Sequence, residues 1–95
     1  MSRRIVTRRG DQPEPPEHPG QLVERLMIER KLKPKDIARA GISGSLVHHI
    51  IKSLRRISAH TAICLETVFP EIKAEDWLIK QNVYDLYQER LKREE

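Results

Sequence analysis

A chain of 95 residues has room for one small domain, and its 34% charged and 4% aromatic residues leave it a small aliphatic core. Its 18 basic and 14 acidic residues give a net charge of +4, which suits a polyanionic partner without requiring one. The single cysteine, Cys64, excludes an internal disulfide framework, and no apolar run approaches the roughly 20 residues of a membrane span. We therefore expect a cytoplasmic protein that gains stability from a partner subunit.

Residues 1–17 have the composition of a flexible arm. They contain three prolines and one glycine but few apolar side chains. Four arginines in this segment could lie along DNA phosphates, although such charge runs are more often simply solvated. These four residues are Arg3, Arg4, Arg8 and Arg9. We expect the folded domain to occupy residues 18–95.

Two helices are predicted in the first part of this domain. From Gln21 to about Lys31, apolar residues recur at helical spacing with charged residues between them. Pro34 suits the first position of a short second helix through Ala40, because proline lacks only a backbone donor that is unpaired there anyway. The side chains expected to face the core from these two helices are Leu22, Val23, Leu26, Met27, Ile37 and Ala38.

A tight turn and a third helix follow. Gly41 allows a sharp left-handed turn, and Ser43 is a favoured N-cap residue for a helix that runs to about Ser53. Apolar residues at helical spacing predict the buried stripe of this third helix. The residues of the stripe are Val47, Ile50, Ile51 and Leu54.

The fourth and fifth helices complete an all-α chain. Ser58 is the expected cap of the fourth helix, which Pro70 ends. The fifth helix is expected to begin near Ala74, with two carboxylates at its positive end, and to run through Leu91. The inward residues of the fourth helix are expected to be Ala62, Leu65 and Phe69.

The segment Lys33–Ser53 has the layout of a helix-turn-helix unit, in which two short helices are joined by a tight glycine turn. Such a unit needs a small residue on the first helix, a turn glycine and apolar anchors on the second helix. The chain supplies them at Ala38, Gly41, Val47 and Ile50. Any three-helix bundle with a tight turn could carry the same residues, so this pattern alone is only moderately specific.

Two motifs that flank this unit are more specific, because unrelated regulators with the same layout lack both. The early motif is His18, Pro19 and Gly20. The late motif is Trp77, Leu78, Gln81, Tyr84, Asp85 and Leu86. With the helix-turn-helix segment between these motifs, the chain from His18 to about Leu86 resembles the HigA antitoxin family within the Xre, lambda-repressor-like group.

The resemblance implies a five-helix, lambda-repressor-like DNA-binding domain that forms a homodimer. The resemblance also implies binding to double-stranded operator DNA, repression of the protein's own operon, and neutralisation of a small basic RNase toxin encoded by the adjacent gene. No enzymatic activity or cofactor is expected. Two alternatives are a stand-alone or phage-type regulator without a toxin, and a degenerate helix-turn-helix that binds only protein.

The chain departs from the family pattern in three places. Lys33 and the proline after it replace a capping serine and a polar residue that often grips a phosphate. Ser53 and the leucine after it replace a glycine and a basic residue. The chain between Ala38 and Gly41 is one residue shorter than usual, which requires a tighter turn or an earlier end of the second helix.

The third helix is expected to enter the major groove of DNA. The candidates for reading bases are Gly44, Ser45, His48, His49 and Lys52. Ser45 and His49 are the first choices, because they lie four residues apart on one face near the helix start. The alternative for the two histidines is a solvated helix face. The candidates for phosphate contacts are Lys35, Arg55 and Arg56.

The fifth helix has apolar residues on more than one side, which a helix packed against a single core does not need. We expect a dimer contact there, and the alternative is a well-covered core helix. The residues expected in the dimer contact are Trp77, Ile79, Val83, Tyr84 and Leu86. A basic toxin is expected to contact the arm and the acidic residues Glu24, Glu29, Glu71, Glu75 and Asp76.

Metal and catalytic interpretations are disfavoured by spacing. His48 and His49 are neighbours, and adjacent residues of a helix do not face one another as metal ligands must. Ser45 could reach one of these histidines, but a hydrolase also needs a third group and an oxyanion hole. The acidic pair Glu75 and Asp76 is better interpreted as the start of a helix.

Overall fold

Five helices account for most of residues 15–94, the part of the chain that the computed structural model describes. No strand occurs within those residues, so the prediction of an all-α, five-helix fold is confirmed. The helices are α1 (Pro19–Arg30), α2 (Pro34–Ala38), α3 (Gly44–Ile51), α4 (Ala59–Val68) and α5 (Ala74–Glu94). Nearly all of the predicted arm, including its four arginines, lies outside the described residues.

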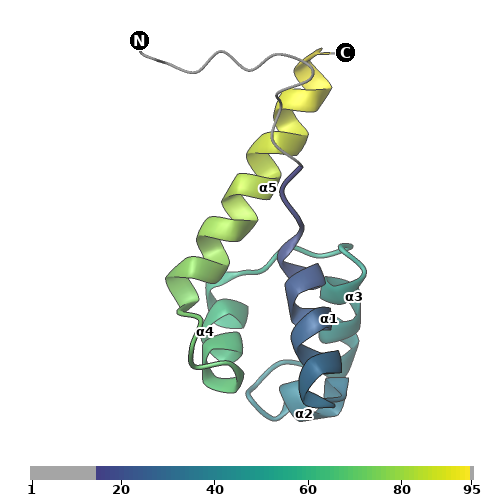
Figure 1. The fold of residues 1–95 in the computed structure, drawn as a ribbon, viewed down its shortest axis with the longest axis vertical. Coiled ribbons are helices and arrows are strands. Elements are labelled where there is room, and N and C mark those ends of the chain that lie inside the picture. The colour runs from purple at the N-terminus through teal and green to yellow at the C-terminus, as the bar shows by residue number, and fades with distance from the viewer. Residues whose placement is uncertain (1–14, 95) are drawn as a thin grey trace.

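The first four helices form a bundle from which one long helix leads away (Figure 1). In this bundle α1 packs against α3, and α2 packs against α3 and α4. α5, with 21 residues, packs against α4 and α1 and then runs past them toward the C-terminus (Figure 1). No helix within residues 15–94 is long and apolar enough to cross a membrane. The largest buried side chains are Trp77, Phe69, Ile37, Ile50, Ile57 and Leu65.

The early motif fixes the start of α1, two residues before the expected Gln21. The N–H of Gly20 donates to Nδ1 of His18 over 2.9 Å, and the N–H of His18 donates to Oε1 of Gln21 over 3.0 Å. These reciprocal bonds form a capping box, and Pro19 occupies the first helical position. A Cβ at position 20 would lie 1.7 Å from the carbonyl oxygen of Ile50, so glycine lets α1 approach α3 closely.

The ends of α1 and α3 share one geometry. Lys31 and Ser53 follow these helices with positive φ angles of 57° and 62°. After α3, the N–H of Ser53 donates to the Ile50 carbonyl over 2.9 Å, and the N–H of Leu54 donates to the His49 carbonyl over 2.8 Å. This pair of bonds is a Schellman motif, and an equivalent pair closes α1. A serine therefore adopts the conformation for which the family pattern has a glycine.

Two expectations about this region are wrong. α2 ends at Ala38 rather than Ala40, because the chain turns at once toward α3. Leu54 was expected to extend the buried stripe of α3, but its side chain is 67% exposed. The left-handed turn at Ser53 takes the chain off the helical path before Leu54, so helical spacing no longer predicts its direction.

Trp77 is a core residue, which corrects its assignment to the dimer contact. Its side chain is 0% exposed, and the centroid of its ring lies 6.3 Å from that of Phe69. Tyr84 is half-buried, and its ring packs edge-on against His18 with centroids 4.9 Å apart. The remaining members of the expected contact are exposed on α5: Ile79, Val83 and Leu86.

Candidate nucleic-acid interface

The orientation of α3 is set by its N-cap and by its buried side. Oγ of Ser43 accepts a hydrogen bond from the N–H of Leu46 over 3.0 Å, which satisfies one of the free donors at the helix start. Val47 and Ile50 are buried where α3 packs against α1 and α2. These contacts fix the rotation of α3 about its own axis and decide which side chains face outward.

The outward face of α3 carries the side chains that the sequence assigned to base reading. Ser45, His48 and Lys52 are exposed, and His49 is half-buried. At about 100° per residue, these four positions share the side of α3 opposite Val47 and Ile50. Within the described residues, no three His, Cys, Asp or Glu side chains are grouped as metal ligands. The structure thus brings the candidates together, and their contact with bases stays a prediction.

Gly44 opens the backbone at the start of this face. A Cβ built on Gly44 has no other atom within 4 Å, so the glycine is not needed for packing inside the chain. Its position at the first residue of α3 lets a ligand approach the backbone closely. Gly20 differs in this respect, because the Ile50 carbonyl occupies the position that a Cβ on Gly20 would need.

The turn between α2 and α3 accommodates the shortened spacing. Gly41 has a φ of +121°, which side-chain-bearing residues rarely adopt, and its N–H donates to the carbonyl of Ala38 over 3.0 Å. Nε2 of His60 on α4 lies 3.1 Å from the carbonyl oxygen of Gly41.

At the start of α2, the N–H of Lys33 donates to the carboxylate of Asp36 over 2.7 Å. Asp36 therefore satisfies one backbone donor where the capping serine is missing.

The three candidate phosphate contacts differ in their surroundings. Lys35 and Arg55 are exposed. Arg56 is also exposed, but its Nε and Nη2 each lie 2.7 Å from Oδ2 of Asp85 on α5. To contact a phosphate, the guanidinium of Arg56 must divide its hydrogen bonds between Asp85 and the phosphate, or release Asp85. No local sequence pattern reveals this ion pair, because its partners are 29 positions apart.

Asp85 belongs to a network through which α5 holds the loop after α3. Nε2 of Gln81 donates to Oδ1 of Asp85 over 3.0 Å, and Oε1 of Gln81 accepts from the N–H of Ile57 over 2.9 Å. Gln81 is buried, so without it the N–H of Ile57 would lose its partner away from water. The late motif therefore positions the segment that carries Arg55 and Arg56.

The early and late motifs meet at His18. This histidine is buried beneath Tyr84, and its Nδ1 acts as an acceptor at the start of α1. Burial lowers the pKa of His18, and the nearby Asp85 carboxylate offsets this effect in part. The neutral imidazole is the form that caps the helix, because a protonated Nδ1 has no lone pair for the N–H of Gly20.

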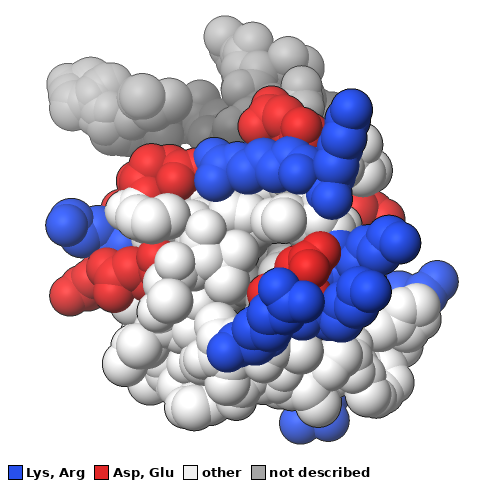
Figure 2. Space-filling model, turned by 90° about the horizontal axis from the view of Figure 1, so that it is seen from below, with Lys and Arg blue, Asp and Glu red and all other residues white. Residues whose placement is uncertain are grey.

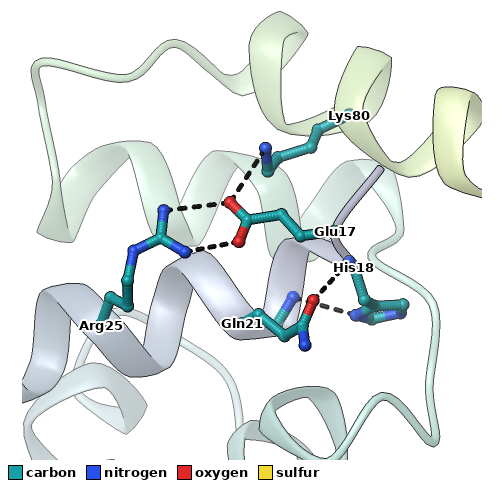
Figure 3. A network of polar contacts seen from close by, with 6 residues as sticks. Glu17, His18, Gln21, Arg25 and Lys80 are labelled. Atoms are coloured by element: carbon teal, nitrogen blue, oxygen red, sulfur yellow. Dashed lines mark hydrogen bonds and ion pairs between the residues drawn. The ribbon is translucent and has the colours of Figure 1, made fainter. Parts of the chain in front are cut away.

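Glu17 joins the segment before α1 to α5 (Figure 3). Its carboxylate accepts hydrogen bonds from the guanidinium of Arg25 on α1 and lies 3.2 Å from Nζ of Lys80 on α5. Hydrogen bonding by Arg25 lowers the pKa of the Glu17 carboxyl, which favours its ionised form. The last residue of the predicted arm therefore contacts two helices, and the boundary at residue 18 stays a prediction.

Positive charge is distributed rather than continuous at the end of the molecule where α2 lies. Figure 2 shows Lys and Arg side chains there in several groups, with carboxylates between them and a broad uncharged area. One ion pair that joins two elements is formed by Arg30 of α1 and Glu71 of the loop before α5. At this end of the molecule, cations therefore alternate with carboxylates and do not form one continuous basic patch.

A short, outward-facing helix set across a second one by a glycine turn, with three helices supporting it, defines a helix-turn-helix protein of the lambda-repressor-like type. Solved structures similar to this chain include antitoxins and a protein in complex with its operator DNA. An addiction-module antidote protein of the HigA family from Coxiella burnetii is 31% identical, with a TM-score of 0.74 over 83% of this chain and 87% of its own. Pseudomonas aeruginosa antitoxin HigA, solved with the higBA promoter, is 32% identical, with a TM-score of 0.72 over 84% and 91%.

A further Pseudomonas aeruginosa protein, solved in complex with its 18-base-pair operator DNA, is 33% identical, with a TM-score of 0.68 over 77% of this chain and 80% of its own. No family model matches the chain, and no curated protein matches it. At these identities and coverages, the chain belongs to the HigA family of antitoxins. This family is not one of enzymes.

Proposed function

We propose that the chain, as a homodimer, binds operator DNA to repress its own operon and neutralises an RNase toxin encoded by the adjacent gene. The observation that carries the DNA part is the outward face of α3, which gathers Ser45, His48, His49 and Lys52 on one side of the helix. Solved relatives of similar sequence support it, since one was determined with the higBA promoter and another with operator DNA.

In the proposed complex α3 lies in the major groove, and Gly44, Ser45 and the two histidines face base edges. Lys35, Arg55 and Arg56 contact phosphates on either side of the groove. Two subunits related by a two-fold axis require a palindromic operator with half-sites spaced by about 10 base pairs, which is one turn of DNA.

The toxin part of the proposal is supported by family membership and by charge. Five carboxylates expected to face a basic partner are exposed: Glu24, Glu29, Glu71, Glu75 and Asp76. Complementary charge speeds the encounter of two such partners and selects between them. Four of the five have no ion pair to another residue within 15–94, whereas Glu71 is paired with Arg30.

One experiment tests both parts. The full chain is expressed alone and together with the product of the adjacent gene, and binding to the DNA upstream of its own gene is measured. We expect tighter binding to this DNA than to random DNA, co-purification with the adjacent product, and rescue of growth from its toxicity. Upstream binding without rescue would leave a stand-alone repressor, and rescue without DNA binding would leave a module that binds only protein.

A further inference from the structure

The side chain of Arg56 belongs to a closed ring of hydrogen bonds. Oε1 of Gln81 accepts from the N–H of Ile57 over 2.9 Å, and Nε2 of Gln81 donates to Oδ1 of Asp85 over 3.0 Å. The other oxygen of Asp85, Oδ2, lies 2.7 Å from both Nε and Nη2 of Arg56. Ile57 directly follows Arg56, so one glutamine holds the backbone beside this arginine and also the carboxylate that binds its side chain.

The ring leads from the interior of the protein to solvent. Gln81 is 1% exposed, whereas the side chain of Asp85 is 35% exposed and that of Arg56 is 65% exposed. A buried glutamine whose amide oxygen and nitrogen are both hydrogen-bonded is fixed in its orientation. The carboxylate of Asp85 is therefore anchored from the inside, and the guanidinium of Arg56 is presented at the surface.

Asp85 occupies only one edge of this guanidinium. The N–H donors of an arginine lie in one plane, where Nε and Nη2 form one edge and Nη1 and Nη2 form another. Asp85 binds the first edge, and Nη1 of Arg56 has no hydrogen bond or ion pair with another residue in the range 15–94. The second edge can therefore receive two oxygens of a second anion, which is the geometry in which arginine binds phosphate.

We propose that Asp85 is a positioning residue for DNA binding, which holds Arg56 by one edge and presents the other edge to a phosphate of the operator. This inference rests on the proposed binding to DNA and assigns a role in it to a carboxylate of α5. Arg56 then stays bonded to Asp85 in the complex. Arg55 offers a comparison, because it is exposed and forms no ion pair within residues 15–94.

The carboxylate of Asp85 has two opposite effects on binding to DNA. Its negative charge repels phosphates and offsets part of the charge of Arg56, so by this effect alone the removal of Asp85 tightens binding. The same carboxylate fixes a side chain that otherwise loses its rotamer freedom when it contacts a phosphate. The proposal requires the second effect to be larger, so the sign of the change in affinity decides between them.

Asp85→Asn is the test variant. Asparagine keeps an oxygen that can accept from Nε2 of Gln81, and it loses the charge that binds Arg56. The Kd for the operator should rise roughly two- to fivefold, as expected for the loss of a partly exposed ion pair. The rise should be similar on random DNA, because a phosphate contact carries no sequence information. Fluorescence anisotropy measures both, and urea unfolding checks that the variant is folded.

Glu89→Gln is the matched control for the change in charge. Glu89 lies one helical turn after Asp85 on α5, and its carboxylate is paired with Arg93 rather than with a candidate phosphate contact. The substitution removes the same charge without touching Arg56. It should therefore leave the Kd for DNA unchanged or slightly lower.

A double-mutant cycle separates the positioning of Arg56 from any general support of the loop by Asp85. Arg56→Ala removes the guanidinium, so in this background Asp85→Asn should no longer weaken binding. Arg56→Lys keeps the charge, but its ammonium lacks a second edge. In this background Asp85→Asn should tighten binding, because it releases the lysine to the phosphate. A carboxylate that only supports the loop would weaken binding in both backgrounds.

The outcomes separate this role from the binding of DNA itself. A loss of affinity in Asp85→Asn that depends on Arg56 and is shared by operator and random DNA supports the proposal. Unchanged binding overturns it, as does tighter binding with a steeper salt dependence, which would mean that Asp85 only competes with phosphate. A loss confined to the operator, or one that persists in Arg56→Ala, also overturns it. A wild-type chain that binds no DNA overturns the proposed function as well.

Discussion

Gly20 and Gly44 each lie in the first turn of a helix, but their surroundings differ. The Ile50 carbonyl occupies the space that a Cβ on Gly20 would need, whereas a Cβ on Gly44 meets open space. We expect Gly20→Ala to lower the free energy of unfolding by about 2–3 kcal/mol or more, because the clash is with backbone. Gly44→Ala should leave it unchanged or slightly higher, since alanine favours the helix. Urea unfolding measures both, and equal stability of the two variants would contradict the packing assigned to Gly20.

The proposed roles of His49 and Arg55 separate in their salt dependence. His49→Ala should cost on the order of 1–3 kcal/mol on the operator and little on random DNA, because only base contacts carry sequence information. Arg55→Ala should weaken binding to both DNAs similarly and flatten the plot of log K against log salt. Fluorescence anisotropy at several salt concentrations measures this. The reverse pattern would mean that the reading face of α3 is wrongly assigned.

The buried His18 makes stability depend on mild acid. Its pKa in the folded chain lies below the ordinary value of 6.5, so in mild acid the unfolded chain binds a proton that the folded chain resists. The contribution of His18 to stability is therefore complete above about pH 6.5 and declines as the pH falls below that value. Urea unfolding between pH 7.5 and about 5.5 should show the decline.

His18→Asn is the matched control for this pH dependence. Asparagine is a good N-cap residue, so it can accept the bond from the N–H of Gly20 without titrating. The variant should show a flatter stability profile between pH 7.5 and about 5.5. The lowered pKa of Glu17 acts at a more acidic pH, because its ordinary value is 4.5 and its contribution is lost below that value. An unchanged slope in His18→Asn would remove His18 as the cause.

At the scale of the helix, the left-handed serine after α3 is a point of strain. An L-residue with positive φ costs roughly 1–2 kcal/mol, and glycine avoids this cost at the expense of about 0.5–1 kcal/mol of chain entropy. Ser53→Gly should therefore raise the free energy of unfolding by about 0.5–1 kcal/mol. Ser45→Gly makes the same substitution inside α3 and should lower the free energy of unfolding by up to about 1 kcal/mol. Thermal unfolding of the two variants should therefore shift in opposite directions.

Helix boundaries followed from local chemistry where a common cap was present. Ser43 and Ser58 predicted the starts of α3 and α4, and both side chains accept the expected bond from the backbone. The start of α1 was placed late because its cap is His18, a residue rarely used for this purpose. Leu54 was misplaced because helical spacing does not reveal where a positive φ interrupts it.

At the scale of the whole molecule, contacts between distant segments decide the candidate site, and periodicity does not predict them. Helical spacing placed Ser45 and His48 on an outward face, since that needs only the buried stripe of the same helix. The ion pair of Arg56 with Asp85 joins residues 29 positions apart. The burial of Trp77 depends on where α4 and α5 cross, so its apolar character alone could not separate a core residue from a dimer contact.

Through the network of Gln81 and Asp85, α5 links the loop after α3 to the expected dimer contact. These two residues hold the loop that follows α3, while Val83 on another side of α5 belongs to the expected dimer contact. No flexible linker separates the loop contact from the dimer contact, because the continuous helix α5 carries both. In the proposed dimer, rigid elements therefore set the distance between the two copies of α3. Such a dimer tolerates little change in the number of base pairs between half-sites, and one inserted half-turn of DNA places the second site on the wrong side of the duplex.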